Sequence, residues 1–460
     1  MKIKMTLFVL MLVSMALNVF SQEYYLYVYA LNEKLKPNLK VSGESNSVEL
    51  NKIFKDFGVE RYYQSFPGAK TPELLNYYEI HFNGDVDSLE NLLKQKKLFE
   101  KVYRCDSYKP ASCSNPVAIN DYKIASGEIN NYALDLLDAQ CAWNITKGDP
   151  NIIVGVIDTE FEMTHEDMVN TFAGAVGTRT HSTDHGTMVS SCVATGTNNH
   201  IGIAGIGYNT RVRGYHVNGS TIWNGIWNAY LDGIKIINVS WTGIGTYPNI
   251  LNIQEMINNG VVLIFAAGND NNAAYHSLYA NIPGVINVSG VDRNNNHGPT
   301  GVAHNDLVDV CALSGRVPVC SLGNTYTIYG GTSLSAPQVA GVVALMRSIN
   351  PNLSPPEIEN IIKTTAVPIA DANQYPGQLG AGRVNAYNAT KRAVCTLQNI
   401  ATISSQTINT EITVNGSTVN IQNTNVAATG KLKVNTCNQV NIGNNFSVTN
   451  GATLNISVGP

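Results

Sequence analysis

Between residues 135 and 393, apolar runs of strand length alternate with segments of helical spacing. The expected strands are IIVGVID (152–158), RVRGYHV (211–217), IKIINVS (234–240), VVLIFAA (261–267), VINVSG (285–290) and LVDVCA (307–312). The expected helices are 186–195, 221–232, 249–259, 334–348, 355–364 and 384–393. Continuous apolar strands that alternate with helices indicate a parallel sheet covered on both faces. The pattern therefore predicts a three-layer α/β/α domain with a mostly parallel sheet, and functional residues at the carboxyl ends of its strands.

Residues 23–104 have a different pattern, typical of a small α+β unit. The aromatic runs YYLYVYAL (24–31), RYYQSF (61–66) and NYYEIHF (76–82) predict strands. Residues 48–57 have helical spacing, and 87–103 is predicted as an amphipathic helix that runs into a last short strand. The resulting order βαββαβ is that of a ferredoxin-like unit. Residues 105–130 contain Pro, Ser, Asn and Gly and are expected to be a linker.

After Cys395 the composition changes again. Residues 398–460 are rich in Thr, Asn, Val, Ile and Gly and carry almost no charge. Short alternating runs such as GKLKVN, NQVNIG and ATLNISV recur every ~8–12 residues, which indicates an all-β module. A small sandwich and a solenoid-like stack both fit this pattern, and a disordered tail is the alternative.

Composition narrows the class of protein and its compartment. Of the 460 residues, 44% are hydrophobic and 14% are charged, and the net charge of −4 gives no footprint for nucleic acid. Two lysines precede an apolar run in residues 1–21, and Val19 and Ser21 fit a small-residue cleavage rule. We interpret this stretch as a signal peptide cut before Gln22. A membrane anchor is the alternative, although the run is short for a span.

The chain has eight cysteines, an even number that suggests disulfides in an exported protein. None forms a C-x-x-C pair, so zinc and redox motifs are not indicated. We expect the local pairs Cys105–Cys113 and Cys311–Cys320, and we allow that Cys192 is an inert buried thiol.

The stretch GGTSLSAPQVAGVVA (330–344) suggests catalytic chemistry. Its two glycines permit a sharp turn before a helix, and we expect Pro337 in the first turn of that helix. Ser333 would then lie at a helix N-terminus, where free N–H groups and the helix dipole favour negative charge. Such a position suits a nucleophilic serine, although a capping serine before a core helix is an equal alternative.

Partners for Ser333 are found at other predicted element ends. Asp158 ends one strand, Asn269 follows another, and His185 begins a helix that ends at Gly196. Each of these residues alone is more often a cap, turn or surface residue. Together, a serine nucleophile, a histidine base and an orienting aspartate perform acyl transfer, with Asn269 and the Ser333 N–H as oxyanion donors.

Four motifs in order resemble the subtilisin-like serine peptidases, over roughly residues 135–393. They are VGVIDT (154–159), HGTMV (185–189) followed by GIAGIG (202–207), AAGND (266–270) and GTSLSAPQVAG (331–341). The chain order Asp, His, Ser is the order of subtilisin. The sequence departs from the family at Glu160, Ser191 and Trp241, which stand where smaller residues are usual.

The resemblance implies a secreted or cell-surface serine endopeptidase with a triad of Asp158, His185 and Ser333, an oxyanion donor in Asn269, and a zymogen. It implies that substrate pairs as an added strand along Ser240–Gly243. It also implies that the primary side chain of the substrate lies beside Ala266–Asn269. The substrate-binding residues expected on this basis are Ser240, Trp241, Thr242, Gly243, Ala266, Ala267 and Gly268. Ser277 is expected near the pocket floor, where no acidic residue is evident.

Four segments follow from these inferences: a signal peptide (1–21), a propeptide-like domain with linker (22–115), a peptidase domain (116–395) and a β-rich module (396–460). The expected partners are polypeptide substrates and the chain's own propeptide. We expect a monomer, without nucleic acid and without a transmembrane segment after signal removal. The chemistry needs no cofactor or metal, and a structural calcium ion cannot be read from the sequence. The alternative is a surface-displayed adhesion protein with a vestigial peptidase core.

Overall fold

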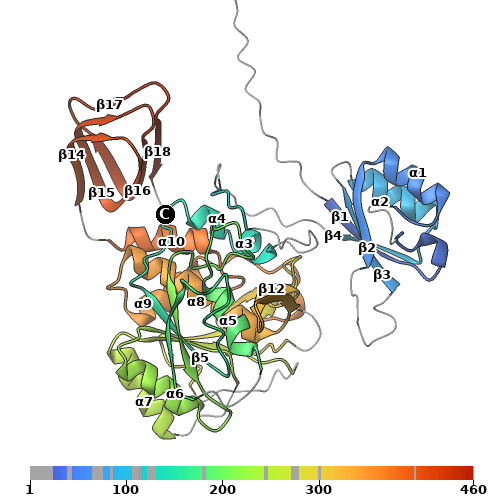
Figure 1. Ribbon diagram of the computed structural model, residues 1–460, viewed down its shortest axis with the longest axis horizontal. Coiled ribbons are helices and arrows are strands. Elements are labelled where there is room, and N and C mark those ends of the chain that lie inside the picture. Colours follow the sequence, from blue (N-terminus) through green and yellow to red (C-terminus); the bar gives the residue numbers. More distant parts are fainter. Residues whose placement is uncertain are drawn as a thin grey trace, which may run out of the picture. The chain divides into compact units, whose positions relative to one another are not determined.

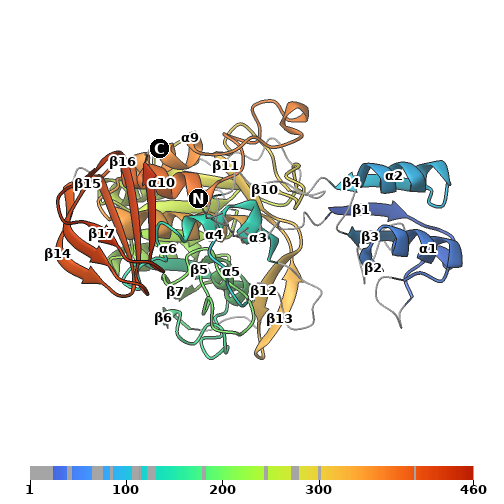
Figure 2. The ribbon, with the colours of Figure 1, turned by 90° about the horizontal axis from the view of Figure 1, so that it is seen from above.

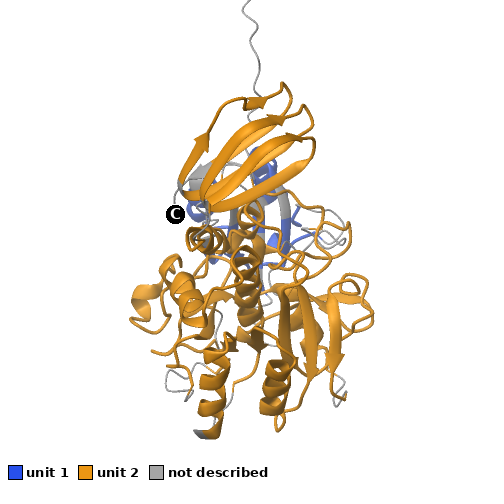
Figure 3. Cartoon of the chain, turned by 90° about the vertical axis from the view of Figure 1, so that its left-hand side faces the viewer, with its two compact units in different colours: residues 1–107 blue, residues 108–460 orange. Residues whose placement is uncertain are grey.

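The computed structural model describes residues 24–38, 44–64, 76–82, 86–105, 113, 116–121, 131–178, 183–242, 247–270, 279–298, 302–397 and 400–458. The expected signal peptide lies outside these residues. The chain divides into two compact units, residues 1–107 and 108–460 (Figure 3). The finer division into four segments stays a prediction.

Unit 1 has the expected order of elements. Its members are β1 (Tyr24–Tyr29), the 3-10 turn η1 (Glu33–Leu35), α1 (Val48–Asp56), β2 (Val59–Gln64), β3 (Tyr77–Phe82), α2 (Val86–Gln95) and β4 (Lys101–Cys105). The antiparallel sheet has the order β2-β3-β1-β4. One face of the sheet, including Leu26 and Ile80, packs on Leu50 of α1 and Leu89 of α2. The ferredoxin-like element order is therefore observed.

The centre of unit 2 is a seven-stranded sheet in the order β11-β10-β9-β8-β5-β7-β6. Its strands are β5 (Ile153–Asp158), β6 (Phe172–Val176), β7 (Arg211–His216), β8 (Ile236–Val239), β9 (Val262–Ala266), β10 (Val285–Val291) and β11 (Val310–Leu313). All six pairings between neighbouring strands are parallel. The six strands expected from the sequence are present, and β6 was not expected.

Helices cover both faces of this sheet, which confirms the three-layer α/β/α architecture (Figure 1). One face packs on α3 (Tyr132–Leu136), α4 (Ala139–Ala142), α5 (His185–Val193), α8 (Thr332–Ile349), α9 (Pro355–Thr364) and α10 (Ala386–Cys395). The other face packs on α6 (Ile222–Leu231) and α7 (Tyr247–Asn258). Successive side chains of a strand point to opposite faces of the sheet. In β5, Val156 packs in the core on one face and Ile157 packs in the core on the other.

A hairpin of β12 (Val317–Ser321) and β13 (Thr325–Tyr329) lies outside the central sheet (Figure 2). It was not expected from the sequence. The Ser191 hydroxyl on α5 accepts a hydrogen bond from the Cys320 N–H at 3.1 Å, so the hairpin is attached to this helix. The short 3-10 turn η3 (Ala372–Gln374) lies between α9 and α10.

The C-terminal residues form a stack of parallel strands, so the solenoid-like alternative holds. The strands are β14 (Ile400–Ile408), β15 (Glu411–Val426), β16 (Lys431–Ile442), β17 (Ser447–Val448) and β18 (Thr453–Val458). Lys431 pairs with Glu411 on one side and with Thr453 on the other, so successive turns of the chain lie directly above one another. Side-chain amides also stack, as in the hydrogen bond of 2.9 Å from Asn435 to Asn415.

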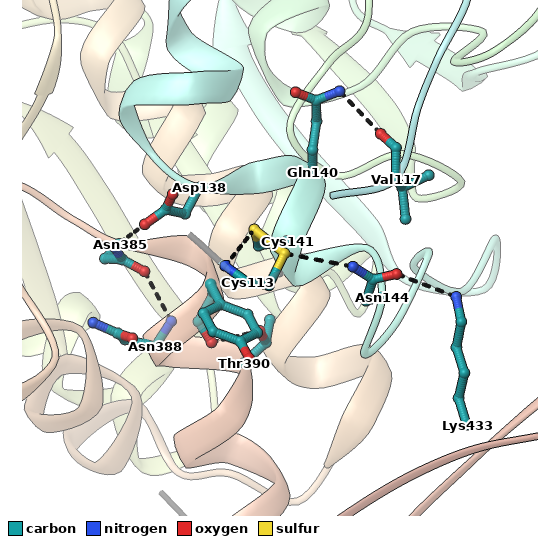
Figure 4. The surroundings of a disulfide bond; sticks show 11 residues. Cys113, Val117, Asp138, Gln140, Cys141, Asn144, Asn385, Asn388, Thr390 and Lys433 are labelled. Atoms are coloured by element: carbon teal, nitrogen blue, oxygen red, sulfur yellow. Dashed lines mark hydrogen bonds between the residues drawn. A yellow bond between two sulfur atoms is a disulfide. The ribbon is translucent and has the colours of Figure 1, made fainter. Parts of the chain in front are cut away.

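Two disulfides are formed, Cys113–Cys141 and Cys395–Cys437. The expected pair Cys105–Cys113 is therefore wrong, since Cys113 bonds to α4 instead (Figure 4). The pair Cys311–Cys320 is also wrong, and both thiols are free and buried. Cys311 belongs to β11 and lies in the central core, whereas Cys320 belongs to β12 of the hairpin and packs with Met168 and Ile203. Proximity in sequence misled the prediction because β11 and β12 belong to different sheets.

Candidate active site

The three catalytic candidates occupy the ends of neighbouring elements in unit 2. Asp158 is the last residue of β5, His185 is the first residue of α5, and Ser333 is the second residue of α8. The helices α5 and α8 pack against each other and against β5. Residues distant in sequence therefore meet at the carboxyl edge of the sheet, where ligands bind in this class of fold.

The aspartate and the histidine form a hydrogen-bonded pair. Nδ1 of His185 lies 2.9 Å from Oδ1 and 3.0 Å from Oδ2 of Asp158. A carboxylate can only accept, so Nδ1 carries the proton and Nε2 is left as an acceptor. Asp158 is fully buried, and its Oδ1 also accepts from the Thr159 N–H at 2.7 Å. These contacts fix both the orientation and the tautomer of the ring.

Close approach of α5 to β5 depends on the glycine after His185. A Cβ atom at Gly186 would lie 2.5 Å from the Glu160 carbonyl oxygen, a distance that requires the backbone to move. The absence of a side chain lets the first turn of α5 pack directly on the end of β5. The sequence HG therefore places the imidazole within reach of Asp158.

Ser333 lies in the first turn of α8 and is buried. Gly331 precedes this helix with φ 125°, a backbone conformation that favours glycine. Amides in the first turn of a helix have no helical acceptor, so the Ser333 N–H is available to a ligand. The Ser333 hydroxyl lines the same cavity as His185, although no hydrogen bond joins these two described residues.

The expected position of Pro337 needs correction. The helix begins at Thr332, so Pro337 lies in its second turn rather than its first. Proline has no N–H to donate to the carbonyl four residues earlier, which is that of Ser333. The Ser240 hydroxyl donates to this carbonyl instead, at 2.7 Å, and itself accepts from Asn238 Nδ2 at 2.9 Å. A residue expected to bind substrate thus also holds the backbone of the candidate nucleophile.

Asn269 is anchored by its amide oxygen. Oδ1 accepts from the Thr332 N–H at 2.8 Å and from the Thr332 hydroxyl at 3.1 Å. The same hydroxyl accepts from the Gly268 N–H at 3.0 Å. Because Thr332 of α8 binds the amide oxygen, the Nδ2 group of Asn269 points away from Thr332. Its N–H groups can therefore donate to another acceptor.

These residues surround a cavity of about 740 Å³. Of the expected substrate-binding residues, Ser240, Trp241, Thr242, Ala266 and Gly268 line it. Ala267 belongs to the same segment but is not part of the lining, and Gly243 and Ser277 lie outside the described residues.

The cavity wall also includes residues that the sequence analysis did not single out as part of the site. They are Thr159, Thr183, Asp184, Met188, Gly219, Asp270, Tyr329 and Thr332. Thr159, Met188, Asp270 and Thr332 lie within the quoted motifs, and Asp184 directly precedes one, so the motifs are the signal that could have found them. Gly219 adjoins no motif, so it could be placed only by the fold.

Opposing influences determine the pKa of His185. Burial lowers it, whereas the charge and hydrogen bond of Asp158 raise it and Asp184 adds a smaller increase. The net result is a pKa above the usual value of about 6.5. A histidine poised in this way is suited to accept and return a proton near neutral pH.

No three His, Cys, Asp or Glu side chains are arranged to hold a metal ion within the described ranges. In the same ranges no helix has the length and apolar character needed to cross a membrane.

The segment that carries these residues matches a known family. The model of the subtilase family, Peptidase_S8, matches residues 149–382. Thermitase from Thermoactinomyces vulgaris is 31% identical over 274 residues, covering 56% of this chain and 95% of thermitase. A "Thermophilic serine proteinase" from Bacillus sp. (strain AK1) is 30% identical over 323 residues, covering 66% and 76% of the two chains.

Among solved structures, one described as proteases from Pseudoalteromonas arctica matches with a TM-score of 0.50 and 26% identity. The match covers 56% of this chain and 94% of that chain.

Proposed function

This chain belongs to the subtilase family of serine endopeptidases, and from that premise we propose that Asp158, His185 and Ser333 are its catalytic triad. The Ser333 hydroxyl attacks the scissile carbonyl while Nε2 of His185 takes its proton. His185 then gives that proton to the leaving amine, and Asp158 stabilises the imidazolium formed in between. Water hydrolyses the acyl-enzyme by the same steps.

The developing oxyanion is stabilised by Nδ2 of Asn269 and by the Ser333 N–H. Support for this role comes from the amide oxygen of Asn269, which is fixed by Thr332. The asparagine is therefore held before the reaction begins, and little reorganisation is needed when charge develops.

An extended substrate pairs with the edge Ser240–Thr242, continuing toward Gly243. Its primary side chain lies against Ala266–Gly268. This segment carries no charged side chain, which favours large apolar residues at the primary position. A peptide-library profile dominated by Lys or Arg at that position would contradict this assignment.

The observation that carries the triad is the hydrogen-bonded pair of Asp158 and His185 in the cavity that also holds Ser333. Purified Ser333→Ala and His185→Ala should lose nearly all cleavage of a fluorogenic peptide. Asn269→Ala should lower turnover by ~10²–10³, a magnitude that comes from subtilisin itself. Asn360→Ala, on the exposed face of α9 and outside the cavity, is the control. Full activity of Ser333→Ala would end the proposal.

We further propose that the protein is exported and made as a zymogen. Residues 1–21 have the charge and apolar pattern of a signal peptide, and the two disulfides are typical of an oxidising compartment. Unit 1 has the size and element order of the propeptides of this family. Parallel sheets fold slowly because their contacts are non-local, so a folding template has a physical rationale.

A further inference from the structure

The substrate cavity is acidic. Two of the residues that line it, Asp184 and Asp270, carry carboxylates beyond the buried Asp158. None of the described lining residues is Lys or Arg. A cleft with charges of one sign attracts ligands of the opposite sign.

Asp184 has the more defined position of the two. It directly precedes α5, is half-buried, and its side chain makes no capping hydrogen bond to that helix. Oδ2 instead accepts a hydrogen bond from the Ser321 hydroxyl on β12. The hairpin therefore holds the carboxylate at the cavity wall beside His185.

The position next to His185 determines which part of a substrate Asp184 meets. His185 must reach both the nucleophile and the leaving amine, so its ring lies over the scissile bond. Asp184 lines the same cavity as His185, so we place its carboxylate near the substrate residues adjacent to that bond. The primary residue is placed elsewhere in the same cavity, against the uncharged segment Ala266–Gly268.

We propose that Asp184 gives this peptidase a preference for a Lys or Arg side chain at a substrate position flanking the primary residue. Asp270, which is exposed, adds a weaker attraction of the same sign. The inference rests on the proposed peptidase function and names the substrate class of the same site. The proposed substrate has an apolar side chain at the primary position and a Lys or Arg side chain at a neighbouring position.

The test uses peptides with a fixed apolar primary residue and Lys, Gln or Glu at each flanking position in turn. For wild type at low salt, we expect kcat/KM to be about tenfold higher with Lys than with Glu at one of the two positions. Attraction and repulsion each contribute a few-fold at a half-exposed site. This ratio should fall toward one in 1 M NaCl, because the Debye length is then about 3 Å and the charges are screened from each other.

Variants assign the preference to a residue. Asp184→Asn should reduce the Lys-to-Glu ratio to about twofold or less, and Asp184→Glu should retain most of it. Ser321→Ala frees the carboxylate but keeps its charge, so it should lower the ratio only in part. Asp270→Asn removes an equal charge from the same cavity, so it is the matched control and should retain most of the ratio. With the Gln peptide, Asp184→Asn should also move the acid limb of kcat/KM to lower pH, which a packing role would not do.

The proposal is overturned if wild type does not distinguish Lys from Glu at either position. It is also overturned if Asp270→Asn, rather than Asp184→Asn, abolishes the ratio. If Asp184→Asn does not fold, a wild-type ratio that is unchanged by 1 M NaCl would refute an electrostatic origin. Failure to cleave every peptide would instead count against the proposed peptidase function.

Discussion

His185 has two carboxylates near its ring, and this fixes the sign of a pH effect. The base must be neutral to accept the Ser333 proton, so kcat/KM rises as the pH increases through the His185 pKa. Asp158 and Asp184 raise this pKa against the effect of burial. The acid limb should therefore have its midpoint above about 6.5.

A pH profile of kcat/KM with an uncharged peptide measures this midpoint for the free enzyme. Asp158→Asn should lower both the midpoint and the rate, since it removes the charge and the orienting acceptor. A wild-type midpoint below about 6 would show that burial outweighs the two carboxylates.

At the scale of residues, motifs led to Asp158, His185, Asn269 and Ser333. The last three line one cavity, and the buried Asp158 is hydrogen-bonded to His185. The role of Asp184 could not be read in this way. Its partner Ser321 is 137 residues away and lies on a hairpin that the apolar pattern did not indicate. Side-chain direction depends on such tertiary contacts, which local sequence does not encode.

At the scale of elements, the contact between Ser240 and α8 replaces a hydrogen bond that Pro337 cannot make. Ser240→Ala should leave the buried Ser333 carbonyl without a donor and lower the free energy of unfolding by about 1–3 kcal/mol. Adding Pro337→Ala restores an N–H four residues after Ser333. The two substitutions should therefore couple, and the double variant should lose less than the sum of the single losses.

Urea unfolding of the four members of this cycle measures the coupling. All four should carry Ser333→Ala, which prevents self-digestion and leaves the carbonyl in place. Strict additivity would mean that Ser240 does not substitute for the missing helical donor.

Strands and helices with strong apolar patterns were predictable from the sequence. Strand β6, the hairpin strand β13 and the start of α8 were not. Strand β6 is short, contains Ala and Gly, and is only half-buried, so its pattern was weak. The residues of β13 are mostly half-exposed, so the apolar pattern of this strand was weak as well. The start of α8 was placed too late because proline was assigned to the first turn, although a side-chain donor permits it in the second.

At the scale of the whole chain, the C-terminal module contacts the α/β domain at α10 and near the start of β5, whereas the site lies at the end of β5. Asn415 donates to the Ile145 carbonyl, Lys433 donates to Asn144, and β15 and β16 pack on α10. Asn144 and Ile145 precede the start of β5, whereas Asp158 ends that strand. Hydrolysis of small peptides should therefore not depend on the module.

Removal of the Cys395–Cys437 bond should lower stability rather than activity. The two cysteines are 42 residues apart, and the chain-entropy model gives about 4 kcal/mol for such a loop, although this model is disputed. Cys395→Ser with Cys437→Ser should lower the Tm and leave kcat/KM for a small peptide near wild type. Truncation after Thr396 is the companion variant, and its loss of small-peptide cleavage while folded would contradict the separation.

The remaining question at this scale is where a zymogen would be cut. The linker composition of residues 105–130 predicts a cut between about 110 and 125. Several residues of that stretch are bound within unit 2 (Figure 4). Cys113 is bonded to Cys141, and the Val117 N–H donates to the Gln140 carbonyl at 3.0 Å. Backbone held in this way cannot extend into an active site.

We therefore expect the cut at the start of that range, before Cys113, so that the bonded residues stay at the N-terminus of the mature enzyme. N-terminal sequencing of wild type should begin between 110 and 113, and Ser333→Ala should accumulate a species that begins near Gln22. Intact mass without reduction should show no retained unit 1, because Cys113 bonds to α4 and not to Cys105. Active enzyme that begins at Gln22, or beyond residue 117, would refute this cut.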